Sequence, residues 1–109
     1  MLTWEDFSKV DMRVGTIVEA QPFPEAKKPA YQLYINFGPL GQKKSSAQIT
    51  QRYKLEELVG KQVIAVVNFP PKQIGPFMSE CLVLGLVGDE GGVNLLSPDQ
   101  AATNGLRVL

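Results

Sequence analysis

The sequence predicts an all-β protein that folds as one small closed barrel. Three observations support this fold class. Short stretches in which apolar and polar residues alternate recur along the chain, as expected for half-buried strands. Clusters of glycine and proline separate these stretches at short intervals. The chain has 109 residues, so we expect a single domain over residues 1–109.

The first predicted element is a short helix over residues 3–10. Thr3 can cap its N-terminus, and Asp6 places an acidic group in the first turn. Trp4, Phe7 and Val10 then fall on one side of the helix. We expect this apolar side to lie on the barrel or on a partner chain.

Residues 12–20 predict the first strand. One alternating set is mostly apolar and is expected to face the core: Met12, Val14, Thr16, Val18 and Ala20. Arg13 belongs to the opposite set. Gly15 inside the strand suits a bend or bulge that helps a small barrel to close.

The next two strands form a predicted hairpin. Prolines at 22, 24 and 29 break the chain into a loop, after which residues 31–37 alternate as a strand. Residues 38–41 carry the strong turn sequence Gly-Pro-Leu-Gly, so residues 43–49 should pair back as a third strand. Tyr31 alternates with core positions and is expected to pack inward.

The second half of the chain predicts a helix, strands and connecting loops. Residues 53–60 read as a helix closed by Gly60. Two apolar strands follow, at 63–68 and 81–87, with a proline-bearing loop between them at 69–78. The remaining segments are a turn at 89–92, a strand at 93–96, and a loop with one more short extended piece at 97–109.

Together these elements predict a five-stranded Greek-key barrel of the oligonucleotide-binding (OB) type. It should carry a short N-terminal helix and a helix between the third and fourth strands. A β-sandwich of similar size is the alternative. The mid-chain helix and the glycine in the first strand favour the barrel.

The composition argues against enzymatic chemistry. The chain has no histidine, which removes the commonest general base and metal ligand, and Cys81 is its only cysteine. Cys81 is expected to be a buried strand residue. No P-loop motif is present either. We therefore expect no enzyme activity, no metal and no cofactor.

The apolar stretches are too short for membrane insertion. The longest, at 63–67 and 81–87, fall well below the roughly 20 residues that a spanning helix needs. The N-terminal residues show early acids and no basic stretch followed by an apolar run, so no secretory signal is visible. A cytoplasmic location is the expectation.

The charges are unevenly placed although the formal net charge is zero. Every charged residue in the middle of the chain is basic: Lys27, Lys28, Lys43, Lys44, Arg52 and Lys54. The acids are concentrated towards the two ends of the sequence. A neutral total can therefore hide one positive face, which would attract phosphate groups. The alternative is an ordinary solvated surface.

A set of polar and basic residues forms the candidate RNA-binding site. It consists of Arg13, Lys43, Lys44, Arg52, Asn68, Lys72 and Ser79. Arg13 could reach a phosphate or could instead pair with Asp11 or Glu19. Asn68 and Ser79 could donate to a ligand or could serve as turn and cap residues.

The loop at 69–78 supplies the candidate peptide-binding site. Its apolar residues are Phe69, Ile74, Phe77 and Met78, and we expect its prolines to keep it out of any sheet. These side chains either plug the end of the barrel or form an exposed groove for apolar partners. Methionine in such a groove adapts to varied partners.

Several strings of the sequence resemble a known family. Residues 11–19 (DMRVGTIVE) and 57–63 (ELVGKQV) are similar to the tRNA-binding domain appended to methionyl-tRNA synthetases and some phenylalanyl-tRNA synthetases. Residues 43–50 (KKSSAQIT), 66–74 (VVNFPPKQI) and 79–85 (SECLVLG) resemble the stand-alone bacterial and archaeal CsaA proteins. The resemblance covers almost the whole chain.

The resemblance implies a homodimeric, export-related chaperone that binds unfolded or export-bound polypeptides without ATP. Exposed apolar residues near both ends, Trp4, Phe7, Val108 and Leu109, independently suggest a dimer. The alternative function is a module that recognises tRNA by its shape and backbone. This sequence departs from the branch appended to synthetases at four positions, where it has Ala47, Gln48, Cys81 and Leu82.

Overall fold

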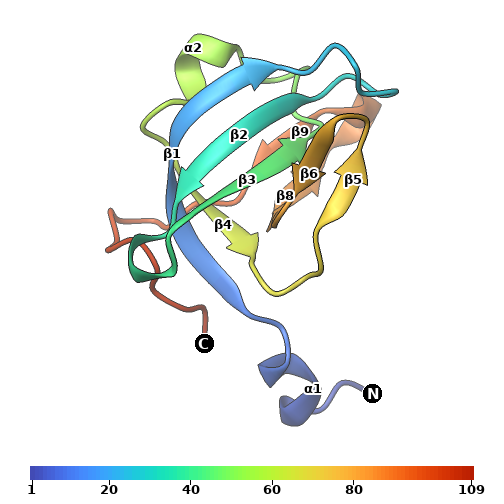
Figure 1. Ribbon diagram of the computed structural model, residues 1–109. Coiled ribbons are helices and arrows are strands. Elements are labelled where there is room, and N and C mark those ends of the chain that lie inside the picture. Colours follow the sequence, from blue (N-terminus) through green and yellow to red (C-terminus); the bar gives the residue numbers. More distant parts are fainter.

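The protein is a nearly closed antiparallel barrel (Figure 1). The computed structural model describes residues 1–88 and 90–109 in full and residue 89 by its backbone alone. Five strands form the main sheet in the order β3-β2-β1-β4-β7. Their bounds are Met12–Pro22 (β1), Tyr31–Asn36 (β2), Gln42–Ala47 (β3), Gln62–Val66 (β4) and Leu82–Val83 (β7). The predicted fold class is confirmed.

Short helices and two hairpins complete the chain. The helical segments are α1 (Trp4–Ser8), η1 (Gly38–Leu40), α2 (Leu55–Leu58) and η2 (Asp89–Gly91). One hairpin pairs β5 (Lys72–Ile74) with β6 (Phe77–Ser79), and the other pairs β8 (Gly85–Val87) with β9 (Val93–Leu95). The helix α2 lies between β3 and β4, as predicted.

The cap of α1 has the predicted form. The Asp6 backbone N–H donates to Thr3 Oγ1 at 3.0 Å, and the Thr3 N–H donates back to the Asp6 carboxylate at 3.4 Å. These two bonds satisfy backbone donors that the first turn leaves free. Because no residue of α1 is buried, the helix makes no contribution to the core of its own barrel.

The strand β1 turns Gly15 and Ile17, which belong to the set opposite to the predicted one, into the barrel interior, while Val14 of the predicted set is also buried. Ile17 is fully buried, whereas Val18 is exposed. A bulge lies between Ile17 and Glu19 where β1 pairs with β2, and it returns Ala20 to the core side. The predicted inward set was therefore right for Val14 and Ala20 and wrong for Val18, because the bulge after Ile17 interrupts the alternation.

Gly15 serves close packing. A Cβ atom at this position would lie 2.6 Å from Ile35 Cγ2 and 2.7 Å from Phe37 Cδ1. Ile35 and Phe37 are fully buried in the central cluster of the barrel, which also contains Ile17 and Val63. The absence of a side chain at residue 15 is what allows these two residues to fill the interior.

The loop at 69–78 forms a hairpin, which corrects the expectation that its prolines keep it out of any sheet. Pro70 and Pro71 precede β5, and Pro76 lies in the turn beside Gly75, whose φ is +56°. No proline therefore occupies a position of the β5–β6 ladder. The short strands pair through Lys72–Ser79, Gln73–Met78 and Ile74–Phe77.

The predicted strand at 81–87 is divided in two. β7 ends at Val83, and β8 begins at Gly85 in a separate sheet. At the break, the Leu84 N–H donates to Ile64 O at 2.9 Å, while Leu84 O accepts from the Leu96 N–H at 3.1 Å. Because Leu84 bonds in both directions, the chain leaves the barrel here and starts the β8–β9 hairpin.

The C-terminal segment pairs along the first half of β1. The Val14 N–H donates to Leu106 O at 3.0 Å, and the Val108 N–H donates to Met12 O at 2.9 Å. This pairing corresponds to the short extended piece that the sequence predicts. In the described part of the chain, no helix is long and apolar enough to cross a membrane.

We expect Gly15→Val to destabilise the barrel strongly. The new side chain would overlap Ile35 and Phe37 in a core that has no room for it, and overpacking of this kind costs about 1–3 kcal/mol or more. Urea unfolding followed by circular dichroism measures the change. Gln21→Val, at an exposed position of the same strand, is the control for adding a valine side chain without overlap in the core. A Gly15→Val midpoint equal to the parent's would contradict the packing account.

Candidate binding surfaces

The β5–β6 hairpin packs on the outside of the barrel through Phe77. The Phe77 ring lies 5.3 Å from the Phe23 ring and 6.5 Å from the Tyr34 ring, between centroids. Lys44 Nζ lies 5.0 Å from the centroid of the Phe77 ring, a cation–π distance. Phe77, Phe23 and Ala30 form a second buried cluster, separate from the barrel interior.

This packing divides the four candidate peptide-binding residues. Phe77 is 5% exposed, and Ile74 is half-buried against the same cluster. The expectation that both line an exposed groove is therefore wrong, because they attach the hairpin to the barrel. Phe69 and Met78 are 55% and 39% exposed and remain available to a partner. Phe77 and Met78 are neighbours in a strand, so their side chains point to opposite faces.

Ser79 and its neighbours connect the hairpin to β3. The Ser46 N–H donates to Ser79 Oγ at 3.1 Å, and the Ser45 hydroxyl donates to Cys81 O at 2.9 Å. The Lys44 N–H donates to the Glu80 carboxylate at 3.0 Å. Ser79 therefore has a structural role in closing the barrel, which is the alternative to ligand binding that the sequence left open.

Arg13 is engaged in an ion pair with Asp11. Arg13 Nε lies 2.6 Å from Asp11 Oδ1, and Arg13 Nη1 donates to Gly105 O at 3.0 Å. The hydrogen bond from Arg13 holds the pKa of the Asp11 carboxyl below its usual value. Of the two alternatives for Arg13, the structure shows the ion pair. It thereby connects β1 to the C-terminal segment.

Asn68 is also used internally. Its side-chain amide donates to Lys9 O at 2.7 Å, and its carbonyl oxygen accepts from the Asp11 N–H at 3.0 Å. The side chain thus fixes the connection between α1 and β1 to the end of β4. Both hydrogen-bonding groups of the amide are engaged, so Asn68 anchors this connection.

The remaining basic candidates do not converge on one pocket. Lys43 and Lys44 lie half-buried on β3, whereas Lys72 is exposed on β5. Arg52 lies elsewhere, in a shallow cleft of about 270 Å³ with Gln51, Glu90 and Gly92. The stem of Arg52 passes so close to Gly92 that a Cβ atom there would lie 2.9 Å from Arg52 Cδ. These cations can therefore make only separate contacts with an extended anion.

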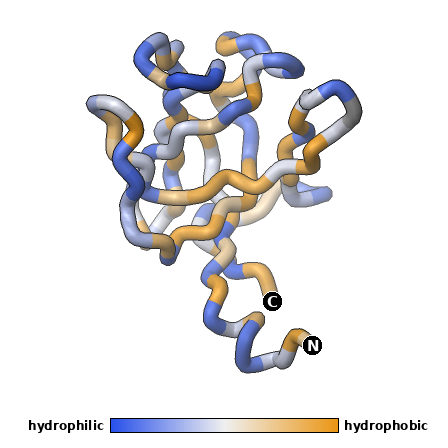
Figure 2. The backbone as a smooth tube through the Cα atoms, turned by 90° about the vertical axis from the view of Figure 1, so that its right-hand side faces the viewer, coloured by the Kyte–Doolittle hydropathy of each residue, from blue (hydrophilic) through white to orange (hydrophobic). Residues whose placement is uncertain are grey.

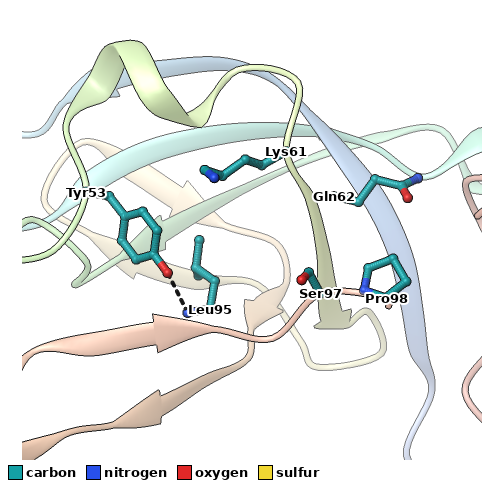
Figure 3. A pocket seen from close by; sticks show the side chains of 6 residues that line it. All are labelled: Tyr53, Lys61, Gln62, Leu95, Ser97 and Pro98. Carbon is teal, nitrogen blue, oxygen red and sulfur yellow. Dashed lines mark hydrogen bonds between the residues drawn. The ribbon is translucent and has the colours of Figure 1, made fainter. Parts of the chain in front are cut away.

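A polar recess that the sequence did not indicate lies beside α2 (Figure 3). Its volume is about 270 Å³, and its lining residues are Tyr53, Lys61, Gln62, Leu95, Ser97 and Pro98. The Leu95 N–H donates to Tyr53 Oη at 3.0 Å, and Gln62 bonds the backbone of Ala102. The Tyr53 hydroxyl and the Gln62 amide are thus already engaged. No pattern along the chain brings these residues together, because they come from segments far apart in the sequence.

The two ends of the chain present an apolar surface at the foot of the barrel. Figure 2 shows both termini below the barrel, with hydrophobic residues at their tips. Trp4 is 88% exposed. A groove of about 390 Å³ runs between α1 and the C-terminal segment, lined by Trp4, Phe7, Ser8, Val10, Arg107, Val108 and Leu109. The exposed apolar ends that the sequence predicts are present.

The single cysteine is a core residue, as predicted. Cys81 is buried, and desolvation raises the pKa of its thiol to about 12. The thiolate, which is the reactive form, is therefore scarce at neutral pH. Among the described side chains, no cluster of three or more potential ligands could hold a metal ion.

Comparisons with known proteins extend over the whole chain. Residues 12–107 match the family described as "Putative tRNA binding domain". The chain is 51% identical to the chaperone CsaA from Bacillus anthracis strain Ames, with a TM-score of 0.95, covering 100% of this chain and 99% of that one. It is 55% identical to the CsaA chaperone protein from Picrophilus torridus, with a TM-score of 0.93 and complete coverage of both chains.

Ligases are similar to this chain in one part only. Methionine–tRNA ligase 1 of Sorangium cellulosum is 44% identical over 106 residues, which is 97% of this chain and 15% of the ligase. The chain spans about 15% of the length of the curated relatives it matches. The prediction of a non-enzymatic protein agrees with the two CsaA structures named above, which are both chaperones. The chain belongs to the tRNA-binding domain family and is a homologue of the chaperone CsaA.

Proposed function

We propose that this protein is a homodimeric chaperone that holds unfolded or export-bound polypeptides in the cytoplasm without using ATP. The observation that carries the proposal is its similarity, from end to end, to two solved CsaA chaperones. Exposed apolar side chains at several places on the surface supply what such a function needs, which is area that can bind apolar segments.

The proposed dimer uses the apolar surface at the foot of the barrel. The helix α1 projects away from the barrel (Figure 1). The Trp4 side chain on this helix is almost fully exposed. Burying one such aromatic side chain contributes about 1.5–3 kcal/mol. A two-fold related copy would cover the same groove on both chains at once, which is the usual arrangement in homodimers.

The proposed client surface includes Phe69 and Met78. Both side chains are exposed, and both belong to a segment that Phe77 attaches firmly to the barrel. A surface that is already rigid loses little conformational entropy when a client binds. The thioether of Met78 can adapt to apolar side chains of different shapes, as a chaperone with many clients requires.

A tRNA-binding module is the second candidate function. The family description and the exposed cations favour it. Lys43, Arg52 and Lys72 have no acidic partner among the described side chains, where the only ion pairs join Asp11 to Arg13 and Arg107. Separate cations on a barrel surface can follow the phosphates of a folded RNA without reading its sequence.

The dimer should dissociate when a polar residue replaces an apolar one in the groove between α1 and the C-terminal segment. We expect Trp4→Ser to convert a dimer into a monomer at micromolar concentration, with an unchanged circular dichroism spectrum because α1 buries no residue in its own chain. Sedimentation velocity measures this. Leu40→Ser, an exposed apolar residue on η1, is the matched control and should remain dimeric. A parent protein that sediments as a monomer would refute the dimer.

Client binding should depend on Phe69 and Met78. We expect Phe69→Ser with Met78→Ser to melt like the parent but to suppress the aggregation of a heat-denatured client at least about tenfold less effectively, because two apolar contacts are lost. Light scattering measures the aggregation. Phe77→Ser is the contrasting variant: its ring is buried, so it should lower the melting temperature. Full protection by the double variant would place the client elsewhere.

Any tRNA binding should weaken steeply with salt. We expect Lys43→Gln with Lys72→Gln to reduce the slope of log affinity against log salt by about 2, since each lost phosphate contact removes about 0.9. Filter binding at several salt concentrations measures the slope. Lys9→Gln with Lys61→Gln is the matched control, because it removes the same amount of charge at positions outside the proposed phosphate contacts. Equal slopes for the two double variants would contradict the proposal that Lys43 and Lys72 contact phosphates. A parent protein that binds no tRNA at low salt would exclude the tRNA function.

A further inference from the structure

The strand β8 is an edge of the structure that carries exposed apolar side chains. In the β8–β9 hairpin, Val93 and Leu95 of β9 pack against the barrel core. All three residues of β8 are exposed, with Leu86 at 61% and Val87 at 82%. An exposed apolar edge strand is a template for pairing with another chain, and proteins usually protect such edges with charges or prolines.

The ladder of the hairpin shows which backbone groups of β8 are free. The Gly88 N–H donates to Gly92 O at 2.6 Å, and the Leu96 N–H donates to Leu84 O at 3.1 Å. Hydrogen-bonded pairs alternate along an antiparallel ladder, so Leu86 directs its N–H and C=O toward β9, as Leu84 does its C=O and Gly88 its N–H. The N–H and C=O groups of Gly85 and Val87 therefore point away from it. The alternation leaves them out of the bonds to β9, and among the described residues no backbone bond outside the ladders reaches them.

The chemistry of this edge fits an extended polypeptide. Two N–H and two C=O groups in alternation are satisfied by the backbone of an added strand. Neither β8 nor β9 contains a charged residue, since their sequences are GLV and VNL. The uncharged strands match an uncharged segment, and Arg52 lies beside the turn at Gly88 and Gly92, not within the two strands.

We propose that β8 binds an uncharged, apolar segment of an unfolded polypeptide as an added β-strand. The inference rests on the proposed chaperone function and adds the mode of client binding. Backbone hydrogen bonds to Gly85 and Val87 hold the segment whatever its sequence, and Leu86 and Val87 contact its apolar side chains. Leu82, also exposed, lies just before this edge on β7. An edge of three residues binds weakly, which suits transient holding of many clients.

The substitution Val87→Pro tests the proposal because it removes the outward N–H and leaves the bonds to β9 in place. Proline is tolerated on an edge strand where its nitrogen faces solvent. Val87→Thr retains the N–H and the branched shape and is the matched control. The probe is a fluorescein-labelled, uncharged peptide of alternating valine and threonine, measured by fluorescence anisotropy. We expect Val87→Pro to bind it about fivefold more weakly or worse, and Val87→Thr within about twofold of the parent.

Amide hydrogen exchange of the unmodified protein gives an independent measurement. The amides of Gly85 and Val87 should exchange fast in the free protein and slow down when the peptide is added, whereas the Leu86 amide changes little because it already bonds β9. This measurement decides the question even if Val87→Pro fails to fold.

Three results would overturn the proposal. Unchanged exchange at Gly85 and Val87 in a protein that still protects a denatured client would refute the β8 site and leave the chaperone function standing. A parent protein that neither binds the peptide nor protects a client would refute both. Slow exchange at these amides before peptide is added, lost in the monomeric Trp4→Ser variant, would show that a second copy covers this edge.

Discussion

The barrel depends on a closure between β3 and residues 79–81, made by one backbone hydrogen bond together with side-chain hydrogen bonds. Here the Glu80 N–H donates to Lys44 O at 2.7 Å, and the Glu80 carboxylate and the Ser79 hydroxyl accept from the backbone of β3. The Ser45 hydroxyl, almost fully buried, completes the closure on Cys81 O. Without these bonds β3 would be an open edge with unsatisfied backbone groups. They also fix the position of Phe77, which lies only two residues earlier in the chain.

The position of Phe77 determines which surfaces are left for partners. OB barrels commonly bind their ligands across the second and third strands. In this protein the β5–β6 hairpin covers part of that face, because Phe77 packs against Tyr34 of β2 and lies beneath Lys44 of β3. The apolar surfaces that remain open lie at the margins, at the chain ends, at Phe69 and Met78, and along β8. This distribution favours partners that bind by apolar contact.

Polar residues were the least predictable part of the candidate site. Arg13, Asn68 and Ser79 have the chemistry of phosphate contacts, yet in the structure they bond Asp11, Lys9 and β3 respectively. Their partners are distant in the sequence for Asn68 and Ser79, and no local pattern identifies such pairs. Their internal bonds satisfy backbone groups that would otherwise be costly to bury. Among the described side chains, Lys43, Arg52 and Lys72 form no ion pair.

The sequence by itself determined the fold class, the family resemblance, the central position of α2 and the burial of Cys81. Alternation of apolar residues, turn residues and composition are local properties, and they carry this information directly. Only the tertiary structure decided which apolar residues are exposed. Phe77 and Met78 are adjacent and both apolar, but the hairpin register turns one toward Phe23 and the other toward solvent. The same holds for β1, where a bulge between Ile17 and Glu19 interrupts the alternation and leaves Val18 exposed. Register depends on contacts between distant segments, and a shift of one residue reverses every side chain of a strand.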